Sequence, residues 1–309
     1  MAAALEVRNL RKAYKDVIAV DGLQLEVQSG ECFGLLGPNG AGKTTTIEIC
    51  EGLIQADSGS VEMLGMRWQT DASELRQRLG IQLQDTQLSE KLTVFETVRL
   101  FRSFYHSGPS PAEAIALVQL QEKQKARVGT LSGGQKQRLA MACALVGDPD
   151  FLFLDEPTTG LDPQARRQLW ELIEEFKLAG RTILLTTHYM DEAERLCDRV
   201  AIMDHGKIIA LGTPRQLIAS IGVEHVVEFS IGRESAALTL SALREIDGVR
   251  EVTAQNGSVQ LQVTELHRAV PALLAELNRQ GLPLTELRTH SASLEDVFVT
   301  LTGRRLRDA

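Results

Sequence analysis

Cysteine is scarce in this sequence, and the four that occur are widely separated. No CxxC pair and no spacing typical of metal ligands connects them, and each sits in an apolar pattern. Scattered cysteines of this kind are typical of reduced, buried thiols in a cytosolic protein, so we expect neither a disulfide framework nor a cysteine metal site. They are Cys32, Cys50, Cys143 and Cys197.

Long apolar runs are absent as well. Stretches such as FLFL and TILL are far shorter than a helix that crosses a membrane requires. The start, MAAALEVRNLRKAY, has neither an apolar segment nor a cleavage site, so we expect no secretory signal. The formal net charge of −8 disfavours a broad nucleic-acid-binding surface. A role at a membrane would therefore depend on a partner chain.

The length of 309 residues suits one large domain and one small one. Residues 4–30 alternate apolar and polar positions, which predicts two antiparallel strands. Short apolar runs typical of buried parallel strands follow at 31–37, 151–157 and 181–188. Helical patterns lie at 44–54, over most of 86–146 and at 164–180, and a hairpin turns at 204–206. This alternation predicts an α/β domain.

A second, smaller unit follows from about residue 223. Its pattern reads strand, helix, strand, strand, helix, strand, with the turn QNGS at 255–258 between the middle strands. This is the order of a ferredoxin-like α+β unit. A last helix carries four apolar residues on one face, namely Leu294, Val297, Phe298 and Leu301. We therefore expect two domains, at 1–220 and 221–309.

The stretch GPNGAGKTT at 37–45 fits the phosphate-loop pattern G-x-x-x-x-G-K-[ST], with a buried strand before it and a helix after it. Glycines let backbone amides wrap a β-phosphate, and the loop has three of them: Gly37, Gly40 and Gly42. Lys43 brings a mobile positive charge to the β and γ oxygens, and the Thr44 hydroxyl is suited to Mg²⁺. A glycine-rich turn with a surface lysine is the weaker alternative in this context.

Two carboxylates stand where the apolar run FLFLDEP ends. Ligands of open parallel sheets bind beyond the carboxyl ends of the strands, so both acids should face the phosphate site. Asp155 is suited to hold Mg²⁺ through water, and Glu156 to orient or deprotonate an attacking water. The alternative is a solvated strand end that leads into a proline turn, and the phosphate loop makes it the weaker interpretation.

The stretch LSGGQ at 131–135 precedes a helix that has no phosphate-loop lysine of its own. Glycines at a helix N-terminus let backbone amides approach an anion, and the helix dipole favours negative charge there. Taken alone, a flexible turn with Ser132 as the N-cap is the favoured interpretation. The surrounding motifs decide between this turn and an anion-binding helix N-terminus.

Six elements follow one another along the chain: GPNGAGKTT, Gln84, LSGGQ, FLFLDEP, GLD at 160–162, and TTH ending at His188. On these, residues 4–215 resemble the nucleotide-binding domain of ATP-binding-cassette (ABC) transporters. The resemblance implies a P-loop NTPase fold with a mixed sheet core, an antiparallel β subdomain and a helical subdomain. It also implies ATP hydrolysis with Mg²⁺. In that family LSGGQ binds the γ-phosphate of a nucleotide held by the other domain of a head-to-tail pair, so a second copy of this chain is implied.

The resemblance further implies a set of site residues. Those implied for catalysis are Glu156, His188 and Gln84. Those implied for nucleotide binding are Tyr14, Gly37, Asn39, Gly40, Ala41, Gly42, Lys43, Thr44, Thr45, Ser132, Gly133, Gly134, Gln135 and Asp162. Those implied for the metal are Thr44, Gln84 and Asp155.

Four of these assignments have a plain structural alternative. His188, implied to contact the γ-phosphate, could be a structural histidine, which is the weaker interpretation here. Tyr14, implied to stack on adenine, could be a half-buried strand residue. Gln84 could be an exposed loop residue, because Leu83 stands where the family often has proline. Asp162, implied to link the two sites of the dimer, could simply initiate a helix before proline.

The ending SASLEDVFVTLTGRRLRD and the length of the C-terminal part resemble the extension of drug-resistance exporters of the ABC-2 class. This likeness implies an ATPase subunit that drives a separate membrane permease, on the cytoplasmic face of the membrane, and exports a drug-like or lipid-like compound. The extension is expected to brace or regulate the dimer, with a plain stability domain as the alternative.

Other functions fit the sequence less well. A soluble ABC ATPase that acts on ribosomes or DNA is the alternative, but one cassette and no long heptad stretch disfavour it. A kinase or GTPase has no use for LSGGQ. The segment 86–130 is the expected permease-docking surface, although we expect most of its aromatic residues to belong to the core. These are Phe95, Phe101, Phe104 and Tyr105.

Overall fold

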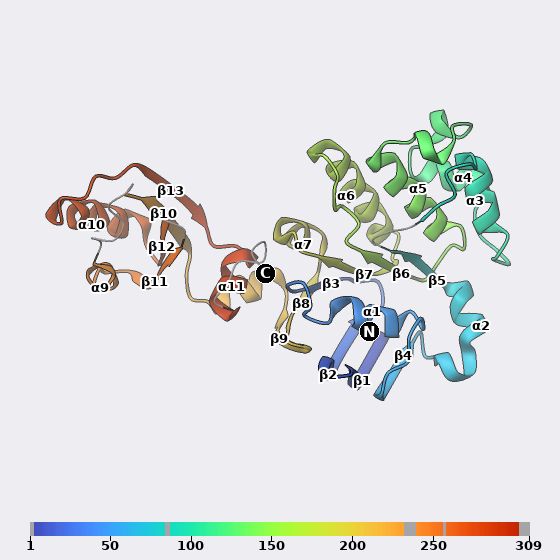
Figure 1. Ribbon diagram of the computed structural model, residues 1–309, viewed down its shortest axis with the longest axis horizontal. Coiled ribbons are helices and arrows are strands. Elements are labelled where there is room, and N and C mark those ends of the chain that lie inside the picture. The colour runs from blue at the N-terminus through green and yellow to red at the C-terminus, as the bar shows by residue number, and fades with distance from the viewer. Residues whose placement is uncertain (1–2, 84–86, 232–238, 256–257, 303–309) are drawn as a thin grey trace. The chain divides into compact units, whose positions relative to one another are not determined.

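A computed structural model describes residues 3–83, 87–231, 239–255 and 258–302 (Figure 1). The chain divides into two compact units, the first within residues 1–214 and the second within 215–304. Each unit has its own sheet and its own apolar core. They are therefore described one after the other.

A six-stranded sheet forms the centre of the first unit. Its order is β5 (Leu79–Gln82), β6 (Phe151–Asp155), β7 (Thr182–Thr187), β3 (Cys32–Leu36), β8 (Arg199–Asp204) and β9 (Lys207–Gly212). All neighbours are parallel except β8 and β9, which form the expected hairpin. Every residue of β3, β6 and β7 is buried, as their continuous apolar runs predict. The carboxyl ends of these three strands consequently meet at one edge.

A second, antiparallel sheet packs below the first. Its order is β2 (Val17–Gln28), β1 (Ala3–Tyr14) and β4 (Ser58–Met63). Helix α1 (Lys43–Cys50) contributes to the apolar core shared by the two sheets (Figure 1). Helix α2 (Trp68–Arg78) follows, and the ring of Trp68 lies against Gly52 while its Nε1 donates to the carbonyl of Cys50 at 2.7 Å. Trp68 is thus a packing residue.

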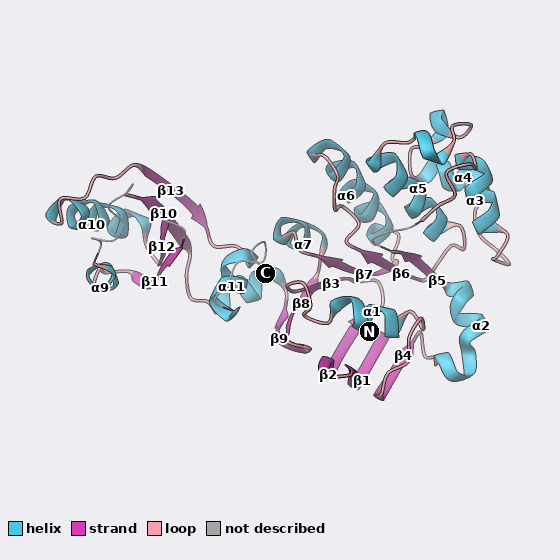
Figure 2. Ribbon diagram, in the orientation of Figure 1, coloured by secondary structure: helices cyan, strands magenta, loops and turns pink. Residues whose placement is uncertain are grey.

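Helices cover the other face of the six-stranded sheet (Figure 2). They are α3 (Val94–Arg102), α4 (Pro111–Leu117), α5 (Gly133–Leu145), α6 (Pro163–Leu178) and α7 (Met190–Leu196), with single 3₁₀ turns at Gln121–Lys123 and Val128–Thr130. Capping boxes start α3, α4 and α5, in which a Thr or Ser side chain and a Glu or Gln three residues on bond each other's backbone N–H. The chain leaves α6 through Gly180, whose φ of 78° is left-handed.

One expectation about the helical segment is wrong. The aromatic side chain of Phe104 is 64% exposed, and Phe95, Phe101 and Tyr105 are only half-buried. For Phe95 and Phe101 the reason is that α3 buries a different stripe, made of Val94, Thr97 and Val98. Phe104 and Tyr105 follow the helix. Phe104 therefore lies at the surface, and the other three aromatic residues are only partly buried.

The second unit starts with α8 (Pro214–Ser220) and contains a four-stranded antiparallel sheet. Its order is β11 (Val249–Gln255), β12 (Ser258–Val263), β10 (His225–Ser230) and β13 (Glu286–Ser291). Helices α9 (Leu240–Arg244) and α10 (Leu266–Arg279) complete the predicted ferredoxin-like order. The centre of the QNGS turn, residues 256–257, lies outside the described residues.

Helix α11 (Leu294–Thr302) ends the described chain. Leu294, Val297 and Phe298 are fully buried as predicted, but Leu301 is 45% exposed because the last turn of the helix is not covered. Within the described residues, no helix is both long enough and apolar enough to span a membrane.

Candidate active site

The loop between β3 and α1 is held in shape by close packing at two glycines. A Cβ atom on Gly42 would lie 2.1 Å from the carbonyl oxygen of Ala19, and one on Gly37 would lie 2.3 Å from that of Met203. Gly42 also has a left-handed φ of 102°, and it caps α1. These glycines are therefore required by the contact of the loop with β2 and β8, in addition to any ligand.

Lys43, the first residue of α1, points back over this loop. Its ammonium donates to the carbonyl oxygens of Gly37 at 2.7 Å and Pro38 at 3.0 Å. Burial lowers the pKa of Lys43, while the nearby carboxylates of Glu156 and Asp155 act in the opposite direction. The loop thus holds a cation whose bonds can be exchanged for those of a phosphate.

A pocket with a volume of about 710 Å³ opens above the loop. It is lined by Tyr14, Val17, Ala19, Gly37, Pro38, Asn39, Gly40, Gly42, Lys43, Thr44, Thr45, Glu156, Thr159 and His188. Tyr14 is 47% exposed at this pocket, with the ammonium of Lys12 5.5 Å from the centre of its ring. A ring that remains this exposed is free to stack on a flat ligand.

The two acids at the end of β6 point in different directions. Asp155 is buried and accepts a hydrogen bond from the Thr186 hydroxyl at 2.5 Å. Glu156 has a left-handed φ of 46°, which is rare outside glycine, and lines the pocket. The backbone turn at Glu156 therefore brings its carboxylate to the pocket, next to the phosphate loop.

The carboxylate of Glu156 has two partners at the pocket wall. Its Oε2 lies 3.2 Å from Nδ1 of His188 and accepts a hydrogen bond from the Thr159 hydroxyl at 3.0 Å. The hydrogen bond from His188 is the main cause that lowers the pKa of Glu156, against the opposing effect of burial. Glu156 is therefore ionised at neutral pH, as a group that accepts a proton from water must be.

His188 is itself held by a stack of side chains that leads to α6. Its ring centre lies 4.1 Å from that of Tyr189, and the guanidinium carbon of Arg166 lies 4.1 Å from the centre of the Tyr189 ring. Arg166 lies in the first turn of α6, four residues after the N-cap Asp162. Contacts consequently run from the start of α6 to Glu156.

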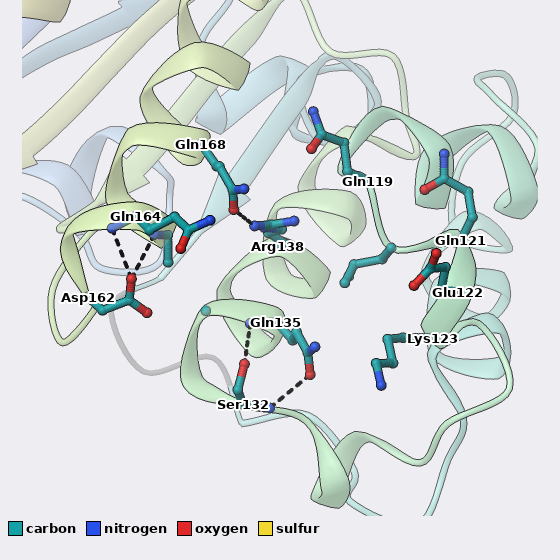
Figure 3. Close-up of a pocket in the computed structure, with 13 residues that line it drawn as sticks. Gln119, Gln121, Glu122, Lys123, Ser132, Gln135, Arg138, Asp162, Gln164 and Gln168 are labelled. Carbon is teal, nitrogen blue, oxygen red and sulfur yellow. Dashed lines mark hydrogen bonds between the residues drawn. The ribbon is translucent and has the colours of Figure 1, made fainter.

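A second pocket, with a volume of about 450 Å³, lies at the starts of α5 and α6 (Figure 3). Ser132 caps α5 and Asp162 caps α6, accepting from the N–H groups of Gln164 at 2.9 Å and Ala165 at 3.0 Å. The hydrogen bond from Ala165 is the largest cause that lowers the pKa of Asp162. In Figure 3, Gln121 and Lys123 lie across the pocket from both caps.

The two pockets share no lining residue. Lys43, Thr44, Glu156 and His188 line the first, whereas the signature residues line the second; these are Ser132, Gly134 and Gln135. Among the described residues of one chain, the phosphate loop and the LSGGQ stretch therefore line different pockets.

The remaining predicted residues fall in three places. Asn39, Gly40 and Thr45 line the first pocket, Ala41 is buried in the loop, and Gly133 begins α5. Gln84 lies outside the described residues. Sequence reasoning missed Val17, Ala19 and Thr159 as lining residues and Thr186 as a partner of both acids. The pairing of β6 with β7 would have pointed to Thr186, but the sequence does not state that pairing.

Comparison with known proteins assigns the family. Residues 20–159 match the ABC transporter family, and residues 212–302 match the C-terminal domain of DrrA1-3-like ATP-binding proteins. The chain is 42% identical to Nod factor export ATP-binding protein I of Cupriavidus metallidurans, over the whole of both chains. The chain belongs to the ATP-binding subunits of ABC transporters. The sequence resemblance is thus confirmed.

Other members of the family support the same assignment. The linearmycin resistance ATP-binding protein LnrL of Bacillus subtilis is 35% identical over 98% of this chain and 100% of its own length. A solved ATP-binding subunit of an ABC transporter superposes with a TM-score of 0.65 at 31% identity, over 71% of this chain and 93% of that one. A dimeric ATP-binding cassette in a post-hydrolysis state with ADP and Pi gives 0.62 at 25% identity, over 68% and 98%. This ABC subunit is an ATP-binding and ATP-hydrolysing enzyme.

Proposed function

We propose that two copies of this chain close head to tail around two ATP molecules and drive a separate membrane permease. The observation that carries the proposal is the separation of the two pockets within one chain. One pocket holds the lysine and the acid, and the other holds capped helix N-termini. A triphosphate needs donors on both sides, and a second copy supplies the side that the first one lacks.

In this proposal the first pocket binds ATP and activates the attacking water. Lys43 moves from its loop carbonyls to the β and γ oxygens, and Tyr14 stacks on the adenine. Glu156 takes a proton from the attacking water, and His188 orients that water and the γ-phosphate. Gln84 would sense the same water.

The second pocket closes the site from the partner. The capping box of Ser132 uses its own N–H and that of Gln135, so the N–H groups of Gly133 and Gly134 have no partner within the helix. Together with the dipole of α5, these groups are suited to the γ-phosphate of the nucleotide held by the other copy. Asp162, at the start of α6, links the two sites through Arg166 and Tyr189.

The site also suits Mg²⁺. This cation prefers oxygen ligands and keeps waters and phosphate oxygens in its shell. Thr44 offers an exposed hydroxyl at the phosphate loop, and Asp155 offers a carboxylate through water; Gln84 would be the third ligand. No cluster of three or more His, Cys, Asp and Glu occurs in the described parts of the chain, so a metal here depends on the nucleotide. The ion would neutralise the charge that develops on the phosphates.

The permease partner places the chain on the cytoplasmic face of a membrane, and no nucleic-acid partner is expected. Two relatives are named for Nod factor export and linearmycin resistance, which supports the export of a drug-like or lipid-like compound. Leu100 and Phe104 expose 46% and 64% of their surface at the end of α3, and such apolar side chains suit a permease helix. The domain at 221–309 is assigned to bracing or regulating the dimer.

The proposal is tested by searching the neighbouring reading frames for a multi-span membrane protein and expressing that protein together with the chain. We expect the two to co-purify from membranes and the transported compound to raise the ATPase rate. A tagged Phe104→Glu variant, which keeps the nucleotide pockets intact, should lose the membrane protein while retaining basal hydrolysis. Purification of the chain without any membrane protein, or an unchanged complex in the variant, would contradict the permease assignment.

A further inference from the structure

Thr186 occupies a special position at the end of β7. It is fully buried and stands directly opposite Asp155 in the parallel pairing of β6 with β7. Its hydroxyl lies within hydrogen-bonding distance of Asp155, the last residue of β6, and of Glu156, which follows it: 2.5 Å from Oδ1 of Asp155 and 3.0 Å from the backbone nitrogen of Glu156. A single side chain therefore contacts two residues to which different tasks are assigned.

The directions of these two hydrogen bonds are fixed by chemistry. A hydroxyl has one proton, and an ionised carboxylate can only accept, so the hydroxyl of Thr186 donates its hydrogen bond to Asp155. The N–H of Glu156 is then received by a lone pair of the same oxygen. The backbone carbonyl of Thr186 accepts from this N–H as well, at 3.2 Å. The bond that the hydroxyl donates to Asp155 and the bond that it accepts from Glu156 strengthen each other, because each polarises the oxygen in favour of the other.

The second of these bonds holds a strained residue. Glu156 is left-handed, with φ at 46°, a conformation that is unfavourable for a residue other than glycine. Glu156 directly follows the last residue of β6, so its backbone decides how the chain leaves the strand. In this conformation its Oε2 lies 3.2 Å from His188 and 3.0 Å from Thr159 at the pocket.

We propose that Thr186 is a positioning residue that ties the metal-side acid Asp155 to the left-handed backbone of Glu156, and so aims the Glu156 carboxylate at the attacking water. The inference rests on the roles proposed above for the two acids. It goes beyond them by assigning a function to a buried hydroxyl that lines neither of the two pockets. Nucleotide binding, which depends on Lys43 and the loop, should be largely independent of it.

Thr186→Val tests the proposal, because valine keeps the shape and removes the hydroxyl. We expect kcat to fall roughly tenfold while KM for ATP changes less than about twofold, since the lost contacts act on the reacting geometry and not on binding. Thr186→Ser retains the hydroxyl and should recover most of kcat. Thr182→Val is the matched control: Thr182 is buried in the same strand, and its hydroxyl accepts from the N–H of Gly30 at 3.0 Å, at the other end of β7.

Several results would overturn the proposal. It is wrong if the valine variant keeps kcat within about twofold, if serine is as slow as valine, or if the Thr182→Val control loses kcat equally. If thermal unfolding finds the valine variant unfolded, Thr186→Ala takes its place with the same outcomes. Glu156→Gln in the same assay distinguishes a failure of the proposed function from a failure of the Thr186 proposal. If Glu156→Gln still turns over ATP, Glu156 does not have the proposed catalytic role. If Glu156→Gln is inactive while Thr186→Val remains active, only the positioning role of Thr186 is wrong.

Discussion

The two pockets of the first unit differ in where their polar groups come from. At the phosphate loop, side chains from several strands converge: a buried ammonium, an ionised carboxylate in a strained backbone and a histidine held by a stack. At the signature pocket, the polar groups are local, because Ser132 and Asp162 each bond the backbone within three residues of themselves. In the proposed dimer, the first arrangement supplies the groups for hydrolysis and the second supplies backbone donors to the nucleotide of the other copy. The difference between the two pockets would then explain why one copy needs the other.

The largest expected effect comes from blocking the pocket that does no chemistry. Ser132→Arg places a long cation where the partner's phosphate should arrive, so hydrolysis should be abolished. The phosphate loop is untouched, and the isolated variant should still bind one ATP per chain with near-normal affinity, measured with a fluorescent nucleotide. Retained turnover would mean that the signature pocket is not part of the site, and lost binding would point to misfolding.

A smaller effect is expected inside the phosphate-loop pocket. Glu156→Gln keeps the size of the side chain and removes the base, so turnover should fall by about 10²–10⁴-fold. ATP binding should persist, and a stable ATP-bound dimer should accumulate, visible by size-exclusion chromatography. Near-normal phosphate release by this variant would remove Glu156 as the catalytic residue.

The smallest expected effect is on stability and concerns Glu51, which follows the helix of the phosphate loop. Glu51 follows α1, is 3% exposed, and neither of its carboxylate oxygens has a hydrogen-bond partner in the described residues. Burial, followed by the charges of Asp155 and Glu48, raises the pKa of Glu51 from 4.5 to about 8. Between these values the unfolded chain has released the proton and the folded chain has kept it, so the free energy of unfolding falls as pH rises, by a few kcal/mol at most.

Glu51→Gln should remove this part of the pH dependence. Compared with the unmodified chain, the variant should gain stability between pH 5 and pH 8 in urea denaturation. Glu171→Gln, at an exposed position of α6, is the control and should leave the pH dependence unchanged. Parallel stability curves for Glu51→Gln and the unmodified chain would contradict the assignment. At the signature pocket the sign is opposite, because Asp162 has a lowered pKa and loses its capping contribution as pH falls.

The sequence predicted the parts of the site that are local. Phosphate loop, signature stretch and acid pair are contiguous motifs, and each lies on the strand or helix end where its pattern placed it. The ferredoxin-like order of the second unit followed from periodicity in the same way. What the sequence could not state is pairing: Thr186 becomes a partner of Asp155 and Glu156 only through the register of β6 with β7.

Surface assignments failed for a related reason. Aromatic residues are usually buried, and that average favoured the core for Phe104 and its neighbours. The buried stripe of α3 is instead decided by which of its faces meets the rest of the helical segment. Helical periodicity likewise gives the shared face of the last helix but not how much of that face is buried, and Leu301 is 45% exposed.

Mixing two inactive variants tests the central claim most directly. Lys43→Ala lacks the phosphate-binding cation, Ser132→Arg lacks a usable signature pocket, and each alone should hydrolyse no ATP. A mixed dimer joins the intact phosphate loop of one copy to the intact signature pocket of the other, so hydrolysis should return on mixing and vanish again on dilution. A mixture that stays inactive although mixed dimers form, or a Ser132→Arg variant that hydrolyses ATP as a monomer, would contradict the account.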